Sequence, residues 1–352
     1  MPNILDIRRR IRSVTNTRQI TKAMKMVSAA KLRRAQERAL AARPYAQMLV
    51  NVLKSLVSRV EIYDPVTGEP RHPLLAQRPE NDVLLIVVTG DKGLAGAFNT
   101  NILKAALRFL QTKEGKNIEI ETIGRKGRDF LRRRYPTSEP EKSGPEKSES
   151  QERPAIAIVG EQVGVLNKVD YAMASELAGR VIDRYSNGEI DSVYLLYNEF
   201  KSMIAQRLIV EQVLPIEQIG EAAVRQAEEM GLKEKKQALE AAREAGVGIR
   251  PADTREIDAA AAKFATAPVD YIYEQPPEEL FRSLLPKYVG IQIFRALQES
   301  VAAEHAARMT AMDAATNNAT DMIDSLTLAM NRARQAKITK EIIEIVSGAA
   351  AQ

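Results

Sequence analysis

Hydrophobic residues at both ends of the chain follow a helical pattern. Near the amino terminus they recur every three or four positions, beginning with Ile4, Ile7, Ile11 and Val14. After a slip in register the pattern continues to about residue 60, and a second series with the same spacing runs from Met312 to Ala336. Such spacing, sustained over many turns, is typical of a coiled coil. We therefore predict one long helix within residues 1–62 and another within residues 284–352.

The predicted helices are too long for a compact domain of this chain to cover. At a rise of 1.5 Å per residue the first would be about 85 Å long. Alanine occupies many seam positions of the second, which lets two helix axes approach closely. The economical arrangement is an antiparallel coiled coil of the two terminal segments, with two separate surface helices as the alternative. Pro44 is expected to bend the first helix locally.

The middle of the chain has a different pattern, in which apolar runs alternate with amphipathic segments. Four runs are predicted to be buried strands, at residues 82–89, 118–124, 155–159 and 192–198. Helices are predicted between them, at residues 101–112, 125–134 and 169–186. Alternating strands and helices favour a mainly parallel, doubly wound sheet. We predict a Rossmann-like α/β domain from residues 80–215 and 259–280, with an antiparallel edge strand at 207–215.

Two segments of this middle region lack the pattern of the rest. Residues 136–154 contain Pro, Glu, Ser and Lys without large apolar side chains, so we expect a disordered loop. Residues 216–258 form a charged insertion, and its part 219–246 is rich in helix-forming residues. We expect this insertion to be helical.

Composition and charge narrow the function. The chain has no Cys and only two His, which excludes thiolate metal sites and disfavours a His-ligated metal centre. Residues 1–44 carry twelve Lys and Arg against Asp6 and Glu37, a net charge of +10, whereas the whole chain is +5. Such a basic arm indicates an acidic partner. Aromatic residues are absent before Tyr45, so this arm has no aromatic side chain on which a nucleic-acid base could stack. An acidic protein surface therefore fits the arm better as a partner than nucleic acid does.

The segment TGDKGLAGAFN, Thr89 to Asn99, suggests a phosphate-binding loop because it follows the first predicted strand. However, its G-x-x-G-x-x-G spacing matches neither the dinucleotide fingerprint nor the P-loop, and no Ser or Thr follows Lys92. A tight strand-to-helix turn is the favoured interpretation. A nucleotide-dependent α/β enzyme with a basic helical arm is the alternative. We identify no catalytic residue, cofactor site or metal site.

Four stretches together resemble one known family. They are RQITKAMKMVSAAKLRRAQ (18–36), NRARQAKITKEIIEIVSGAAA (331–351), residues 296–319 and TGDKGLAGAFN itself. Each is similar to the corresponding segment of the gamma subunit, or central stalk, of rotary F-type ATP synthases. Because the matches sample both ends and the middle domain, the resemblance covers nearly the full chain.

The resemblance implies a rotor stalk that transmits torque between the membrane c ring and the alpha/beta catalytic ring, so that ion flow drives ATP synthesis. It implies the alpha, beta, epsilon and c-ring subunits as partners, with no chemistry, nucleic acid or small-molecule ligand of the chain's own. It also implies a peripheral position on the cytoplasmic face of a bacterial inner membrane. The insertion would hinder reverse rotation, which is a hypothesis of ours.

The resemblance further implies two sets of contact residues. The beta subunit would contact Met24, Lys92, Arg334, Gln335, Thr339 and Glu341. The c ring and the foot would involve Tyr271, Tyr273 and Glu274.

Overall fold

A computed structural model describes most of the chain. The described residues are 4–57, 59–64, 70–137, 155–200, 206–217, 219, 223–229, 232–233, 236–237, 240–241 and 273–350.

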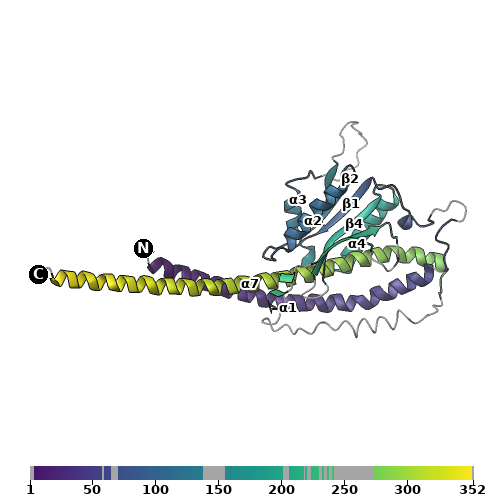
Figure 1. Cartoon of the computed structure of the whole chain (residues 1–352). Coiled ribbons are helices and arrows are strands. Elements are labelled where there is room, and N and C mark those ends of the chain that lie inside the picture. Colours follow the sequence, from purple (N-terminus) through teal and green to yellow (C-terminus); the bar gives the residue numbers. More distant parts are fainter. Residues whose placement is uncertain are drawn as a thin grey trace.

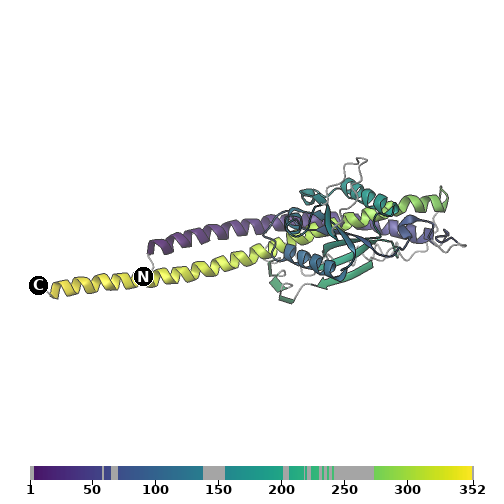
Figure 2. The same ribbon diagram turned by 90° about the horizontal axis from the view of Figure 1, so that it is seen from above.

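Two long helices form the axis of the molecule. Helix α1 spans Ile4–Val57 and helix α7 spans Pro277–Ala350. They run antiparallel and side by side, and the last part of α7 extends well beyond the start of α1 (Figures 1 and 2). The predicted antiparallel coiled coil is therefore confirmed, and α1 continues through Pro44 as a single helix.

The contact between the two helices is apolar for most of its length and polar at one level. Leu32 of α1 belongs to the same buried cluster as Ala303 and Ala306 of α7. Further toward the start of α1, Lys25 and Asp313 form an ion pair whose side chains are each 7% exposed. Thr316 donates a hydrogen bond to Thr21 across the same contact, at 2.8 Å between hydroxyl oxygens. Small side chains such as Ala303 and Ala306 therefore lie in this contact.

A six-stranded sheet in the order β3-β2-β1-β4-β5-β6 lies beside the coiled coil (Figure 1). Its strands are β1 (Asp82–Val88), β2 (Asn117–Ile123), β3 (Ile156–Gln162), β4 (Ser192–Phe200), β5 (Gln206–Leu214) and β6 (Ala223–Glu229). The first four are parallel, β5 is antiparallel to β4, and β6 is antiparallel to β5. This confirms the mainly parallel, Rossmann-like sheet.

Two predictions for this region are wrong. Residues 223–229 form strand β6 where we expected helix, and β5 is consequently not the edge strand. The sequence AVRQAEE favours helix by its composition, but pairing with the open edge of β5 satisfies its backbone groups and overrides that weak preference. The described residues between 232 and 241 are helical, as predicted. Residues 138–154, expected to be disordered, lie outside the described residues.

Alternating side chains of β1 point to two different cores. Val83, Leu85 and Val87 pack in one cluster with helix α2 (Phe98–Thr112). Leu84, Ile86 and Val88 pack in the other with helix α4 (Tyr171–Ser186) and the first part of α7. Helix α3 (Arg125–Leu131) and the short helices η1 (Pro73–Leu75) and η2 (Val165–Asn167) complete the described domain. Residues of α1 and α7 belong to both clusters, so the coiled coil contributes to the cores on both faces of the sheet.

Candidate interaction surfaces

The carboxyl-terminal part of α7 carries four of the predicted contact residues on an exposed helix. Arg334, Gln335, Thr339 and Glu341 are all exposed, and this part of α7 lies beyond the end of α1 (Figure 1). The Thr339 hydroxyl donates to the Gln335 carbonyl at 3.0 Å, and Lys337 pairs with Glu341 at 3.6 Å. Within the described chain, Arg334 makes no ion pair. The polar side chains of these four residues are therefore accessible at the surface of this end of α7.

The predicted foot residues lie at the opposite end of the coiled coil. Tyr273, which precedes α7, is half-buried and donates a hydrogen bond to Ser55 of α1 at 3.0 Å. The Arg59 guanidinium lies 5.4 Å from the centre of its ring. Glu274 is exposed, and Tyr271 lies outside the described residues. Tyr273 therefore has a structural contact within the chain, in addition to any contact with a partner.

Met24 and Lys92 occupy different surroundings. Met24 is half-buried on α1, next to the buried Lys25 that pairs with Asp313. Lys92 is exposed in the loop between β1 and α2. The structure brings neither of them to the carboxyl-terminal part of α7, so the predicted beta contacts form separate surfaces along the axis.

The glycine-containing loop is a turn whose polar groups are bound by its own neighbours. The Gly90 N–H donates to Asn99 Oδ1 at 2.8 Å, and the side chain of Asp91 accepts from the backbone N–H groups of Arg125 at 3.0 Å and Gly164 at 3.1 Å. Gly96 and even Leu94 adopt positive φ angles, of 55° and 61°. These contacts hold together the ends of three strands, as expected of a tight strand-to-helix turn.

A basic cavity of about 210 Å³ lies between this loop, η2 and the two long helices. Five cationic side chains line it: Lys31, Arg34, Arg38, Lys92 and Arg308. Its carboxylates are those of Asp91 and Glu304, so the charged lining carries a net charge of +3. Glu304 is paired with Arg308, whereas the other four cations make no ion pair in the described part of the chain. The cavity therefore presents unneutralised positive charge.

The pKa of the His305 imidazole is lowered in this cavity, in part by the positive charges around it. Burial, and after it the nearby charges of Arg308, Lys31 and Lys92, together lower its pKa to about 4. His305 is thus neutral at pH 7, and its Nδ1 lies 3.3 Å from a guanidinium nitrogen of Arg308.

Sequence reasoning missed this convergence. Lys31, Arg34 and Arg38 are spaced by three and four residues and share one face of α1. That spacing was the available signal. The contribution of Lys92 and Arg308, which are distant in sequence, required the tertiary structure.

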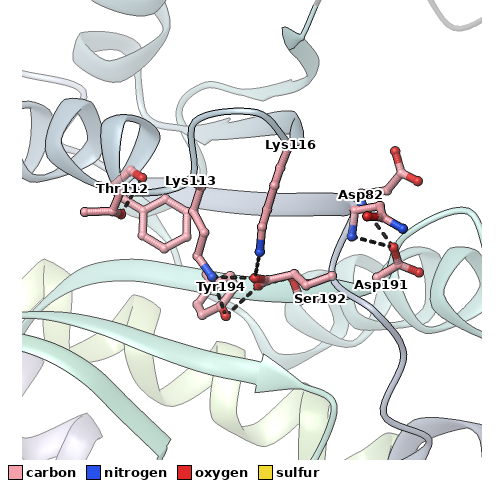
Figure 3. Close-up of polar contacts among 10 residues, drawn as sticks. Asp82, Thr112, Lys113, Lys116, Asp191, Ser192 and Tyr194 are labelled. Atoms are coloured by element: carbon pink, nitrogen blue, oxygen red, sulfur yellow. Dashed lines mark hydrogen bonds and ion pairs between the residues drawn. The ribbon is translucent and has the colours of Figure 1, made fainter.

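A second polar cluster lies at the amino-terminal edge of the sheet (Figure 3). Lys113 donates to Glu80 at 2.5 Å, Lys116 pairs with the same carboxylate, and Ser192 and Tyr194 donate to its other oxygen at 2.8 and 2.7 Å. Although partial burial opposes ionisation, these hydrogen bonds lower the pKa of Glu80 to about 2. A fully paired cluster of this kind fixes the end of α2 to the sheet.

The described residues hold neither a cluster suited to a metal ion nor a helix suited to span a membrane. They contain no group of three or more His, Asp or Glu arranged to hold a metal ion. Within the same residues, no helix is both long enough and apolar enough to cross a membrane.

Comparisons with known proteins agree on one family. The sequence model described as ATP synthase matches residues 3–352. The chain is 49% identical to the ATP synthase gamma chain of Solibacter usitatus, over 100% of this chain and 99% of the relative. It is 41% identical to that of Pelotomaculum thermopropionicum, with the same coverage. Among solved structures, a chain of the Euglena gracilis mitochondrial ATP synthase, from an assembly of OSCP, F1 and c ring, matches with a TM-score of 0.51. That match covers 99% of this chain and 94% of the other at 17% identity, so it supports the fold.

The fold is thus that of a coiled-coil shaft carrying a Rossmann-like domain. With the full-length sequence matches, this chain belongs to the family of ATP synthase gamma chains.

Proposed function

We propose that this chain, as the central rotor stalk of an ATP synthase, transmits torque between a membrane c ring and an alpha/beta catalytic ring and does no chemistry itself. The observation that carries the proposal is the shape of α7. Its last turns project beyond α1 and expose Ile338, Ile342, Ile343, Ile345 and Val346. An exposed apolar helix end of this kind needs a surrounding partner. A ring of subunits around the shaft supplies one.

The beta subunits contact the shaft at two levels in this proposal. Near the carboxyl terminus Arg334, Gln335, Thr339 and Glu341 offer exposed hydrogen-bonding groups. Closer to the α/β domain, Lys92 and the other cations of the basic cavity attract an acidic segment of beta. Met24 lies on α1 between these two levels, where an added charge would disturb packing against beta.

The opposite end of the molecule is the foot, which faces the c ring and the epsilon subunit. Tyr271, Tyr273 and Glu274 are the proposed contact residues. The cation–π contact of Tyr273 with Arg59 and its hydrogen bond to Ser55 support the role, because they hold this segment against the end of α1. In this proposal the complex lies on the cytoplasmic face of a bacterial membrane.

The division of the chain follows the same scheme. Residues 1–62 and 284–352 form the shaft, and residues 80–215 with 259–280 form the foot domain. The insertion 216–258 acts as a mechanical regulator that hinders reverse rotation, and its added strand β6 supports attachment to the foot domain.

Reconstitution with alpha, beta and epsilon subunits tests the proposal. The wild-type chain should restore ATP hydrolysis by alpha and beta, and the double variant R334A/Q335A should lower the rate at least about tenfold, corresponding to about 1.4 kcal/mol. The control R332A replaces an exposed cation of the same helix and should be neutral.

Two results would contradict the proposal. One is equal loss of activity in R334A/Q335A and R332A. The other is ATP hydrolysis by the isolated chain. Deleting residues 219–246 tests the regulator separately: hydrolysis should rise while synthesis is retained, and an unchanged ratio would remove that role.

A further inference from the structure

The basic cavity described above is lined by four elements that the fold holds together. Its walls come from α1, from the loop after β1, from η2 and from α7. Asp91 of the loop accepts hydrogen bonds from the backbone N–H groups of Arg125, where α3 begins, and of Gly164, which precedes η2. Leu32 of α1 and Ala303 of α7 belong to one buried cluster. The cavity is therefore formed by packed elements and not by surface side chains alone.

Arg308 is the buried cation of this cavity. Its side chain is 10% exposed and pairs with Glu304, one turn earlier on α7. Its Nε and one terminal nitrogen donate to the carbonyl oxygen of Gly93, each at 3.4 Å. The other terminal nitrogen lies 3.3 Å from Nδ1 of His305. These contacts fix the positive charge of Arg308 at the wall of the cavity.

Four further cations line the cavity without a carboxylate partner in the described part of the chain. Lys31, Arg34 and Arg38 lie on one face of α1, and Lys92 belongs to the loop. Like charges three and four residues apart on a helix repel one another and destabilise it. An anion bound among these side chains would remove that repulsion.

Charge and residue type indicate the kind of anion. The five cations and the carboxylates of Asp91 and Glu304 give the described lining a net charge of +3, which a single carboxylate group would leave largely uncompensated. A phosphate monoester carries a charge of about −1.5 to −2 at pH 7 and three strong acceptor oxygens. Three of the five cations are arginines, whose guanidinium groups match phosphate oxygens bidentately. The volume of about 210 Å³ is many times the roughly 10–15 Å³ that one water requires, so a group of several atoms fits.

We propose that the basic cavity binds a phosphate group, with Arg34, Arg38 and Lys92 as binding residues and with Lys31 and Arg308 completing the positive charge. The group is either a free phosphate or pyrophosphate ion or the phosphate chain of a nucleotide, since the recognising chemistry is the same. The acidic segment of beta proposed above would compete for the same cations. The binding of phosphate itself does not rest on the rotor function, because it is a property of this chain alone.

Equilibrium dialysis of the full-length chain against radiolabelled pyrophosphate, at constant ionic strength and without magnesium, tests the proposal. Wild type should bind about one pyrophosphate per chain. R34Q/R38Q should lower the affinity at least about tenfold, because two exposed cations of the cavity are lost. The control R8Q/R12Q removes the same charge, with the same spacing, from exposed positions near the start of α1 and should bind as wild type does. K92Q changes the loop instead of α1, should also weaken binding, and tests the site if R34Q/R38Q does not fold.

The imidazole of His305 supplies a second readout that belongs to this cavity. The chain has only two histidines, so the signal that disappears from the NMR spectrum of H305Q is that of His305. Pyrophosphate should raise the pKa of this imidazole, because a bound anion offsets the surrounding positive charges that help to lower it. The pKa of His72, which does not line the cavity, should not change.

Competition experiments separate the possible sources of the phosphate group. Displacement of pyrophosphate by inorganic phosphate supports a free ion as the ligand, and stronger displacement by magnesium-free ADP supports a nucleotide. Acetate at equal ionic strength should not displace it. Pyrophosphate binding that is absent, that is equal in R34Q/R38Q and R8Q/R12Q, that acetate displaces equally well, or that leaves the pKa of His305 unchanged would overturn the proposal.

Discussion

Individual charged residues are buried where the coiled coil meets its neighbours. Lys25 and Asp313 pair between the helices, and Glu304 pairs with Arg308 beside the glycine-containing loop. A Cβ atom on Gly90 would lie only 2.8 Å from a carboxylate oxygen of Glu304, so a larger residue there would require this carboxylate to move. Buried ion pairs add little net stability, but breaking one leaves an uncompensated charge. These pairs therefore favour one register of α7 against α1 and the loop.

His305 gives a pH prediction at the same scale. Its pKa is about 4 in the folded chain against 6.5 for a free imidazole, so the unfolded state binds more protons between these values. Stability from this neutral imidazole is present above pH 6.5 and is lost as the pH falls toward 4. The total is about 3 kcal/mol at 1.36 kcal/mol per pKa unit. The basic groups that face His305 are Lys31, Lys92 and Arg308, and the carboxylates nearby are Asp91 and Glu304.

The measurement is urea unfolding of wild type and H305Q between pH 7 and 4. The difference between the two should shift in favour of H305Q as the pH falls. Parallel pH profiles would show that His305 does not carry the effect.

At the scale of elements, α1 is a single helix from Ile4 to Val57 despite Pro44 in its interior. Proline lacks the N–H that would reach the carbonyl four residues earlier, and an interior proline costs about 3 kcal/mol. Packing against α7 holds the helix together, since apolar side chains such as Leu49 and Leu53 follow Pro44 and are buried. Tertiary contact here outweighs a local breaker.

Replacing Pro44 by Ala should therefore stabilise the chain, by up to about 3 kcal/mol. Urea unfolding followed by far-ultraviolet circular dichroism measures the change, and A42S, at a neighbouring position of the same helix, controls for a surface substitution. A stability equal to or below that of wild type would mean that Pro44 suits its place in the helix.

The element scale also shows where pattern reasoning fails. The strands β1, β2, β3 and β4 were predictable because their apolar runs are local properties of the sequence. Strand β6 was not, since its seven residues resemble helix formers and become a strand through pairing with β5.

At the scale of the whole molecule, the shaft and its domain leave one end of α7 uncovered (Figure 2). The side chains exposed there include Ile342 at 55%, Ile345 at 70% and Val346 at 61%. Such a patch is unfavourable in water and promotes association. The isolated chain should consequently self-associate through this end.

Sedimentation velocity of the isolated chain tests this. The variant I342K/V346K, which places two charges four residues apart on one helix face, should shift the distribution toward monomer at least about tenfold. L5K, at an exposed apolar residue of α1, is the matched control and should have a smaller effect. An unchanged distribution in I342K/V346K would place the association elsewhere.

The sequence by itself determined the two long helices and the mainly parallel sheet, because helical periodicity and buried apolar runs are written within each segment. It favoured an antiparallel coiled coil of the two helices, and the tertiary structure decided for that pairing. The sequence also contained the family motifs at both ends. Only the tertiary structure decided that Lys31, Arg34 and Arg38 face Lys92 and Arg308, and that residues 223–229 extend the sheet. These features join residues far apart in the chain. Their positions follow from strand order and from the docking of the sheet on the shaft, which no local pattern encodes.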